Sequence, residues 1–272
     1  VMIETEHKYK IYKKNFGLIN WIGAYSLWLK ECKRFLVVWI QTIFSPLITS
    51  LLFLMVLSLA LGGNARGDVL GFPFITFLAP GLISMSIIQQ GFSHSSSSLI
   101  IGKMQNTIID ILQAPLTASE VVFAITLAAV TRSMVIAFVS IVVFYFIVEL
   151  NVYSFFHVFI FTFLGSFILG ALGIIVGLWA EKFDHMASAT NFIITPLSFL
   201  SGTFYTIDRL PVFLRNISEF NPFFYMIDGF RYGFLGVSDG DLNFGLTYLI
   251  ILSFLTWFGA YILYKKGYKI KS

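Results

Sequence analysis

The hydrophobic positions of this chain fall into six long runs separated by short polar connections. A helix needs about 20 mostly apolar residues to cross a bilayer, so each run predicts a membrane-spanning helix. The fifth run is the weakest, because it holds only about 17 residues, roughly 26 Å at helical rise, and Pro196 interrupts it. We therefore expect an all-α, polytopic membrane protein with six transmembrane helices, at Phe35–Leu61, Phe74–Phe92, Val121–Val148, Phe155–Ala180, Ala189–Tyr205 and Phe244–Tyr264.

Residues 18–34, before the first run, have an amphipathic pattern. A set of large apolar residues recurs there at helical spacing, namely Leu18, Trp21, Ile22, Tyr25, Trp28 and Leu29. Basic residues gather at the end of the segment, as is typical of a helix that lies in the membrane interface. We predict such a helix at Leu18–Arg34, after a polar, lysine-rich cytoplasmic tail at 1–17 that has no signal peptide. The helix is either a simple anchor or a mechanical element.

The connection between the second and third runs, about Ser93–Glu120, predicts a short helix at about 103–114. One face of this helix would carry Lys103, Asn106, Asp110 and Gln113. Pro115 would end it, and Thr117 with Glu120 would begin the next helix by capping. The short helix could be the seat of a soluble partner or could only pack on lipid. The next connection on the same side is a charged turn with Lys182 and Asp184, either a second contact or a solvated turn.

Composition and charge exclude a soluble domain and orient the chain. The sequence is 57% hydrophobic and 12% charged, with a mean hydropathy of +0.84 over 272 residues. If the N-terminus is cytoplasmic, 13 of the 18 basic residues lie on the inner side and four on the outer side, with Arg132 inside a span. This is the positive-inside bias. Without the fifth span, the four lysines after residue 264 would lie outside. Residues 35–272 therefore form a single six-span domain with both termini in the cytoplasm, and the net charge of +4 is no signal for nucleic acid.

Polar residues within and after the spans are the candidates for a transport path. Arg132 lies near the middle of the third span, where an ionisable residue normally faces protein or water. It either lines a path for an anionic headgroup or is a structural arginine bonded to carbonyl oxygens of neighbouring helices. Gln41, Phe199 and Tyr205 are further candidates for the path.

The stretch Thr195–Gly236 predicts two short amphipathic helices on the outer side, at about 208–236. Neither piece is long enough to cross a bilayer, and charges lie among aromatic residues throughout both. We expect these two re-entrant helices to cover the outer mouth of a path. Their charged residues are Asp208, Arg215, Asp228 and Arg231.

Several kinds of chemistry have no signal in the sequence. There is no phosphate-binding G-x-x-x-x-G-K-[ST] loop, so this chain does not hydrolyse ATP by that route. The four histidines lack metal-ligand spacing, and no G-x-S-x-G elbow or paired carboxylates occur. We therefore expect no enzyme, no metal and no cofactor in this chain.

Six segments spread over the whole chain resemble the membrane-spanning subunits of type-2 ABC exporters, within them the bacterial inner-membrane permeases that pair with a separate ATPase. They are Trp39-Ile-Gln-Thr, Phe77-Leu-Ala-Pro-Gly-Leu-Ile-Ser-Met-Ser, Ile109-Asp-Ile-Leu-Gln-Ala-Pro, Lys182-Phe-Asp, Thr195-Pro-Leu-Ser-Phe-Leu-Ser-Gly-Thr-Phe-Tyr and Asn221-Pro-Phe-Phe-Tyr-Met-Ile-Asp-Gly-Phe-Arg-Tyr-Gly-Phe-Leu-Gly. The chain departs from the family pattern at Asp110, where Glu is common, and at Thr203, where a second Gly is common.

The resemblance implies a half-transporter that pairs with a second copy of itself and with two cytoplasmic ATPase subunits, which would hold ATP and magnesium. It implies that the helix at 103–114 is the coupling helix, that Leu18–Arg34 is the connecting helix, and that Asp208–Ser218 and Pro222–Gly236 are the outer re-entrant helices. The first, second and fifth spans would line a path for an amphipathic, lipid-linked or hydrophobic substrate leaving the cytoplasm or inner leaflet.

Two other functional classes remain open from the residues alone. A secondary transporter or channel usually carries paired intramembrane charges or inverted repeats, and this sequence has one intramembrane arginine and no repeat. A membrane enzyme would usually show a polar catalytic cluster, which we do not find in the sequence.

Overall fold

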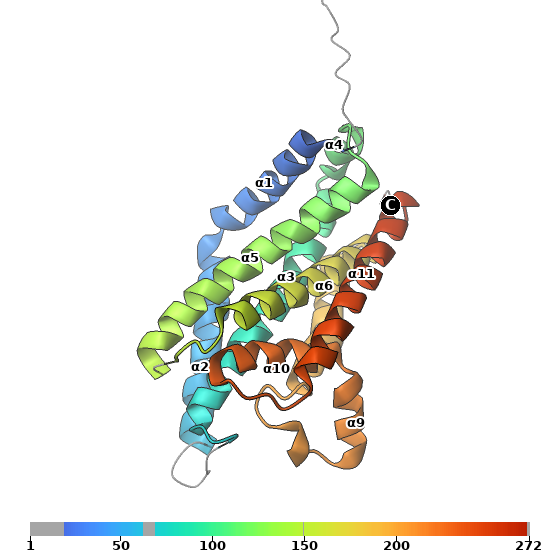
Figure 1. Ribbon diagram of the computed structural model, residues 1–272. Coiled ribbons are helices and arrows are strands. Elements are labelled where there is room, and N and C mark those ends of the chain that lie inside the picture. The colour runs from blue at the N-terminus through green and yellow to red at the C-terminus, as the bar shows by residue number, and fades with distance from the viewer. Residues whose placement is uncertain (1–18, 62–68, 149, 271–272) are drawn as a thin grey trace, which may run out of the picture.

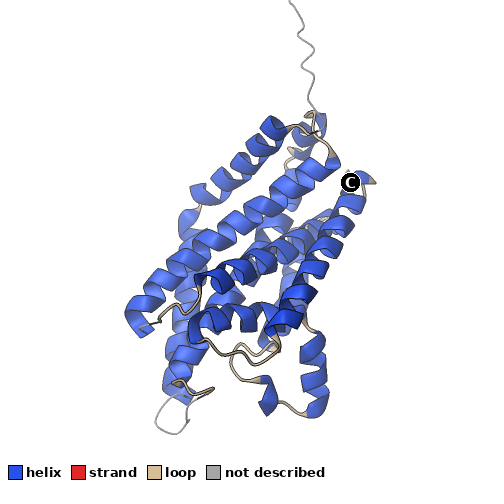
Figure 2. Ribbon diagram, viewed as in Figure 1, coloured by secondary structure: helices blue, strands red, loops and turns tan. Residues whose placement is uncertain are grey.

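The computed structural model describes residues 19–61, 69–148 and 150–270. The predicted tail 1–17, Leu18 and the outer Arg66 lie outside the described residues. Within them the chain is helical and contains no strand, only an isolated bridge between Val69 and Phe72 (Figure 2). The α-helices are α1 Trp21–Val37, α2 Ser45–Leu61, α3 Phe74–Met104, α4 Ile108–Gln113, α5 Ala118–Val148, α6 Phe155–Trp179, α7 Phe183–Ala189, α8 Thr195–Phe199, α9 Val212–Phe220, α10 Pro222–Leu235 and α11 Leu242–Lys265.

Five of the described helical segments are long and apolar enough to cross a membrane. They are Ile40–Ala60, Phe74–Met104, Ala118–Val148, Phe155–Trp179 and Leu242–Lys265. In Figure 1 they extend between two ends of the molecule, with α1, α4 and the C-terminus at one end and α9 at the other. The predicted all-α class is confirmed, and the helices at five of the six predicted runs meet the length and hydropathy expected of a span.

The core of the bundle is the contact between α3 and α6. Glycine makes this contact possible: a Cβ atom on Gly173 would lie 2.5 Å from the carbonyl oxygen of Phe92, and one on Gly177 would lie 3.0 Å from the Cβ of Leu99. Small residues let two helix backbones approach each other closely where the membrane supplies no hydrophobic driving force. The buried helix α3 also contacts α2, α5 and α10, and it forms the centre of the fold.

The helix α3 is longer than the sequence predicts. The predicted span ends at Phe92, whereas the helix continues to Met104 through a run of serines. The hydroxyl of Ser96 donates to the carbonyl of Phe92 at 2.8 Å, and that of Ser97 donates to the carbonyl of His94 at 3.1 Å. These two serines therefore satisfy their hydroxyl groups inside the helix and need no solvent.

Two π-helical turns precede prolines. The turn η1 (Ile40–Phe44) lies just before Pro46, and η2 (Thr190–Ile194) lies just before Pro196. A proline has no N–H and its ring clashes with the carbonyl four residues earlier, here those of Thr42 and Phe192. Each of these carbonyls lies within the widened π turn, which accommodates the ring without ending the helix.

The boundaries predicted for the fifth run, Ala189–Tyr205, were wrong. The helical run begins six residues earlier and continues through α7, η2 and α8, from Phe183 to Phe199. It ends there because Gly202 takes a left-handed φ of 71° and the Thr203 hydroxyl bonds the carbonyl of Ser198 at 2.6 Å. Residues 200–205 therefore form a turn and not the last part of a span.

Candidate functional site

The short helix α4 is largely exposed and lies at the end of the molecule that also carries α1 and the C-terminus (Figure 1). Only Ile108 of its six residues is buried, while Ile109, Asp110, Leu112 and Gln113 are exposed. The predicted extent, 103–114, was wrong, because Asn106 adopts a left-handed φ of 59° and separates α3 from α4. Asparagine tolerates this conformation better than most residues do. Asp110 and Gln113 are therefore on α4.

Lys103 and Asn106 lie outside α4. Lys103 belongs to the last turn of α3, and its ammonium group donates to the carbonyl oxygens of Leu178 and Ala180 at 2.8 and 2.6 Å. These carbonyls are at the end of α6, where a cation is favourable. Asn106 is exposed in the break between the two helices. The single polar face predicted for 103–114 is thus divided among three segments.

A groove of about 440 Å³ separates α4 from the interfacial helix α1. It is mostly apolar, with one charge from each helix near it, Lys30 on α1 and Asp110 on α4. The helix α1 begins three residues later than predicted and packs on α5 through Leu27, Cys32 and Phe35. The expected apolar surface remains exposed, with Trp21, Ile22 and Tyr25 each more than half exposed. The lining residues of the groove are Asn20, Ile22, Gly23, Ser26, Leu27, Lys30, Asp110, Ile111, Ala114, Pro115 and Leu116.

One carboxylate joins the two helices that flank this groove. Glu120 accepts from the backbone N–H of Asn20 at 2.6 Å and from that of Thr117 at 2.7 Å. The Thr117 hydroxyl accepts in return from the Glu120 N–H at 3.4 Å, which completes the capping box that the sequence predicts. Asn20 also caps α1 and donates to the carbonyl of Pro115. The start of α1 and the connection from α4 to α5 are therefore one hydrogen-bonded unit.

The second charged connection, between α6 and α7, is also exposed. Lys182, Phe183 and Asp184 are exposed, as expected of a solvated turn or a contact surface. Glu181 pairs with Lys269 at 2.8 Å, and this hydrogen bond lowers the pKa of the Glu181 carboxyl and raises the pKa of the Lys269 ammonium.

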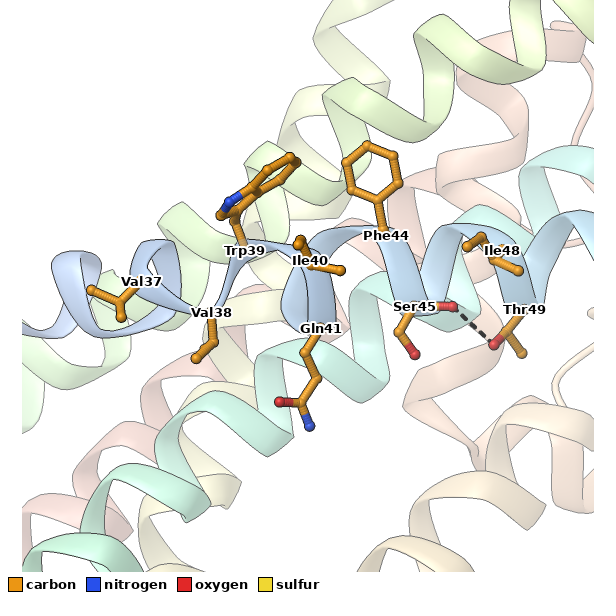
Figure 3. Close-up of a pocket in the computed structure, with 9 residues that line it drawn as sticks. All are labelled: Val37, Val38, Trp39, Ile40, Gln41, Phe44, Ser45, Ile48 and Thr49. Atoms are coloured by element: carbon orange, nitrogen blue, oxygen red, sulfur yellow. Dashed lines mark hydrogen bonds between the residues drawn. The ribbon is translucent and has the colours of Figure 1, made fainter.

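A shallow groove of about 530 Å³ follows the kinked start of the first span (Figure 3). Gln41 is exposed and points to the opposite side of the helix from Trp39 and Phe44. All nine lining residues of the groove lie between positions 37 and 49 of this one segment.

Arg132 does not lie in that groove. It is 7% exposed on α5, and its guanidinium donates to the side-chain oxygen of Gln90 on α3. Its partner is thus a glutamine side chain, not the helix carbonyls that the structural alternative expects. Phe199 and Tyr205 lie apart from it, at the end of α8 and in the following turn, where the Tyr205 hydroxyl donates to the carbonyl of Phe199 at 3.1 Å. The four path candidates are therefore not brought together in one cavity.

The outer segment separates into an exposed and a buried helix. The first, α9, exposes both its charges and its apolar residues, and Arg215 pairs with Asp208 at 2.9 Å and with Glu219 at 3.2 Å. The second, α10, is buried against α3, α6 and α11. The expectation of two similar amphipathic helices is therefore wrong for α10, in which Asp228 and Arg231 are 2% and 1% exposed.

The buried charges of α10 bind backbone groups of nearby loops. Asp228 accepts the N–H groups of Asp239 and Gly240 at 2.9 and 3.0 Å. Arg231 donates to the carbonyl of Gly202 and lies over the ring of Phe77 at 4.0 Å. The glycines of this helix were an available sequence signal for its burial. A Cβ atom on Gly229 would lie 2.2 Å from the Phe161 ring, so glycine marks the face that packs closely on α6.

Sequence reasoning missed a polar cluster between α1 and α3. Glu31, 2% exposed, accepts from Arg34 at 2.9 Å and from Ser98 at 2.8 Å. Arg34 also donates to the carbonyl of His94 at 2.9 Å. The spacing of Glu31 and Arg34, three apart on a helix, was the available signal for a pair.

The fold and these surfaces define a multi-pass helical membrane protein with a short, exposed helix and a charged turn beside a helix of interfacial composition. A family model described as "ABC-2 type transporter" matches residues 24–235. The chain belongs to this family and is therefore the membrane subunit of a transporter. The family is one of permeases and not of catalytic proteins.

Curated relatives agree with this assignment. The inner membrane transport permease YadH of Escherichia coli strain K12 is 33% identical over 238 residues, which cover 87% of this chain and 93% of YadH. Nodulation protein J of Neorhizobium galegae is 23% identical over 254 residues, covering 92% of this chain and 94% of that protein. Nodulation protein J of Rhizobium leguminosarum bv. trifolii is 25% identical over 226 residues, 81% and 83% of the two chains.

Proposed function

We propose that this chain is the permease half of an ATP-driven exporter in a bacterial inner membrane. Two copies would pair with two cytoplasmic ATPase subunits that bind ATP and magnesium, and both termini would lie in the cytoplasm. The observation that carries the proposal is α4, a short helix held by one buried residue, Ile108, with its other side chains at least partly exposed beside a groove. An exposed helix that carries both apolar and charged side chains suits a contact with a soluble partner.

The proposed ATPase seat comprises α4, the groove beside α1 and the turn at Lys182 and Asp184. Its chemistry is mixed: Ile109 and Leu112 on α4 are each 40% exposed, and Asp110 lies among them. Protein interfaces typically combine a few apolar anchors with a polar rim. We assign Asp110 and Gln113 to direct contact with the ATPase.

The proposed second copy would cover the apolar faces that the single chain leaves open. In the run from Phe183 to Phe199, the side chain of Phe192 is 80% exposed. Most of the first span is also not buried within the chain. We take the run at 183–199 as the sixth crossing segment, because the lysines that precede it and those that follow it in the chain then all lie on the inner side. Its 17 residues extend roughly 26 Å, slightly less than a typical hydrocarbon core. The helices α9 and α10 would then be the outer re-entrant pair.

The proposed cargo is an amphipathic, lipid-linked or hydrophobic molecule moved outward from the cytoplasm or inner leaflet. The support is chemical: the groove along the first span is largely apolar, with Gln41, Ser45 and Thr49 as its polar members. A path of this kind suits a molecule with one long apolar part and few polar groups.

The test is copurification with the ATPase and measurement of ATP hydrolysis in nanodiscs. We expect the chain alone to show no hydrolysis, and Asp110→Lys to lose ATPase binding while inserting normally. Glu219→Lys makes the same charge change on exposed α9 and serves as the control. Robust hydrolysis by the chain alone, or a normal complex with Asp110→Lys, would overturn the proposal.

A further inference from the structure

The residues after α11 turn back toward α4. We call Lys266–Ile270 the hook. The N–H of Tyr268 donates to the carbonyl of Leu263 at 3.1 Å and that of Gly267 to the carbonyl of Tyr264 at 3.0 Å, which together form a Schellman motif. Gly267 has the left-handed φ of 68° that this motif requires, and Lys269 has a second positive φ of 47°. The two left-handed residues reverse the chain within five residues.

The apolar end of the hook lies in the same buried cluster as α4. Ile270 is 5% exposed and Ile108 is 4% exposed, and both belong to a cluster with Leu99 of α3 and Leu178 of α6. Ile108, the one buried residue of α4, and Ile270, the apolar end of the hook, are therefore part of one buried cluster. The Schellman motif alone is sufficient to end α11. The burial of Ile270 is therefore an additional feature that the end of the helix does not require.

The polar contacts of the hook reach the other cytoplasmic connection. Lys103, three residues before the break at Asn106, binds the carbonyls of Leu178 and Ala180 and also that of Lys269, at 3.3 Å. Lys269 in turn donates to Glu181 at 2.8 Å. The end of α3, the turn after α6 and the hook therefore meet at one ammonium group.

We propose that Lys103 and the hook form a brace that fixes α4 relative to the turn Glu181–Asp184. Lys103 is a positioning residue: its ammonium holds the two connections that face the cytoplasm, and it need not touch a partner itself. The mechanical consequence rests on the proposed function. If an ATPase moves one of the two connections, the brace would make the other connection move with it. The brace itself is a property of the chain alone.

The first experiment therefore uses the full chain in nanodiscs without any partner. Lys103→Met keeps the aliphatic stem and removes the ammonium group. Hydrogen exchange should become about tenfold or more faster in both 104–116 and 180–186, since a hydrogen bond to a charged group contributes about 1.5–3 kcal/mol. Lys266→Met, an exposed lysine of the hook, should change neither segment, and Lys103→Arg should restore most of the protection.

Faster exchange near residue 103 alone, or no change in 180–186, would overturn the brace. Ile270→Ala provides a second, milder variant that loosens the hook without removing a charge, and it should affect 104–116 in the same direction. With an ATPase present, Lys103→Met should retain complex formation and KM for ATP but lower transport per ATP hydrolysed. Failure of the proposed function would remove this last result and leave the exchange result intact.

Discussion

Replacing Glu120 with alanine tests how the start of α1 is attached to the connection between α4 and α5. The carboxylate accepts the N–H of Asn20 at 2.6 Å and that of Thr117 at 2.7 Å, so Glu120→Ala removes two charge-assisted hydrogen bonds at once. Such bonds contribute about 1.5–3 kcal/mol each, and we take the low end because Thr117 is exposed, which gives about 3 kcal/mol. The Asn20 side chain still donates to Pro115, so α1 should loosen locally and stay on α5.

The assay is hydrogen exchange in nanodiscs, measured on peptides that cover residues 19–27. A loss of about 3 kcal/mol corresponds to roughly 150-fold faster local opening, since each 1.4 kcal/mol is tenfold. Glu120→Gln keeps one acceptor oxygen and should give an intermediate effect, and Ser119→Ala should give almost none. Unchanged exchange at 19–27 in Glu120→Ala would refute the reasoning, because it would mean that packing on α5 alone holds the start of α1.

Two further predictions concern the membrane interior. Gly173→Ala places a Cβ atom 2.5 Å from a backbone carbonyl of α3, so the free energy of unfolding should fall by about 1–3 kcal/mol, as is typical of overpacking, and the apparent thermal midpoint should fall with it. The matched control is Gly259→Ala, whose Cβ meets one side-chain atom at 3.7 Å. Equal midpoints for the two variants would contradict the close packing at Gly173. Arg132→Leu should destabilise the protein by about 1–3 kcal/mol, because it leaves Gln90 unpaired in the interior. The double variant with Gln90→Leu should recover part of this loss. An unchanged thermal midpoint together with reduced transport would instead assign Arg132 to the path.

Hydropathy predicted where the chain forms long helices. It was misleading where polar side chains find hydrogen-bond partners inside the protein. The serines after Phe92 were assigned to a connection because their type is polar, yet the hydroxyls of Ser96 and Ser97 bond carbonyls of the same helix. The same limit applies to α10: Asp228 and Arg231 indicated a surface, and they are buried against backbone groups of loops 11 and 29 residues away in the sequence.

The candidate site was predictable by segment and less so by residue. Asp110 is exposed on α4 in the manner that periodicity predicts, but periodicity assumes one continuous helix and cannot detect a single left-handed residue such as Asn106. Lys103 was grouped with Asp110 on that assumption. Its partners are the carbonyls of Leu178 and Ala180, which lie 75 and 77 residues later in the chain. No local pattern encodes such a contact.

The two ends of the molecule are held together by different interactions, and this difference bears on how they could move. The end opposite α4 depends on the buried helix α10, whose charges are enclosed by loops and whose glycines pack against α6. Close packing of this kind resists small displacements, because shifted atoms have nowhere to go. The end that carries α4 depends on a few charged groups that bind backbone atoms, Glu120 on one side of α4 and Lys103 on the other. Hydrogen bonds to main-chain groups keep segments in register, while Ile108 is the one buried residue of α4 itself. Force applied to α4 would therefore reach α1 and the α6–α7 turn first, before the packed opposite end responds.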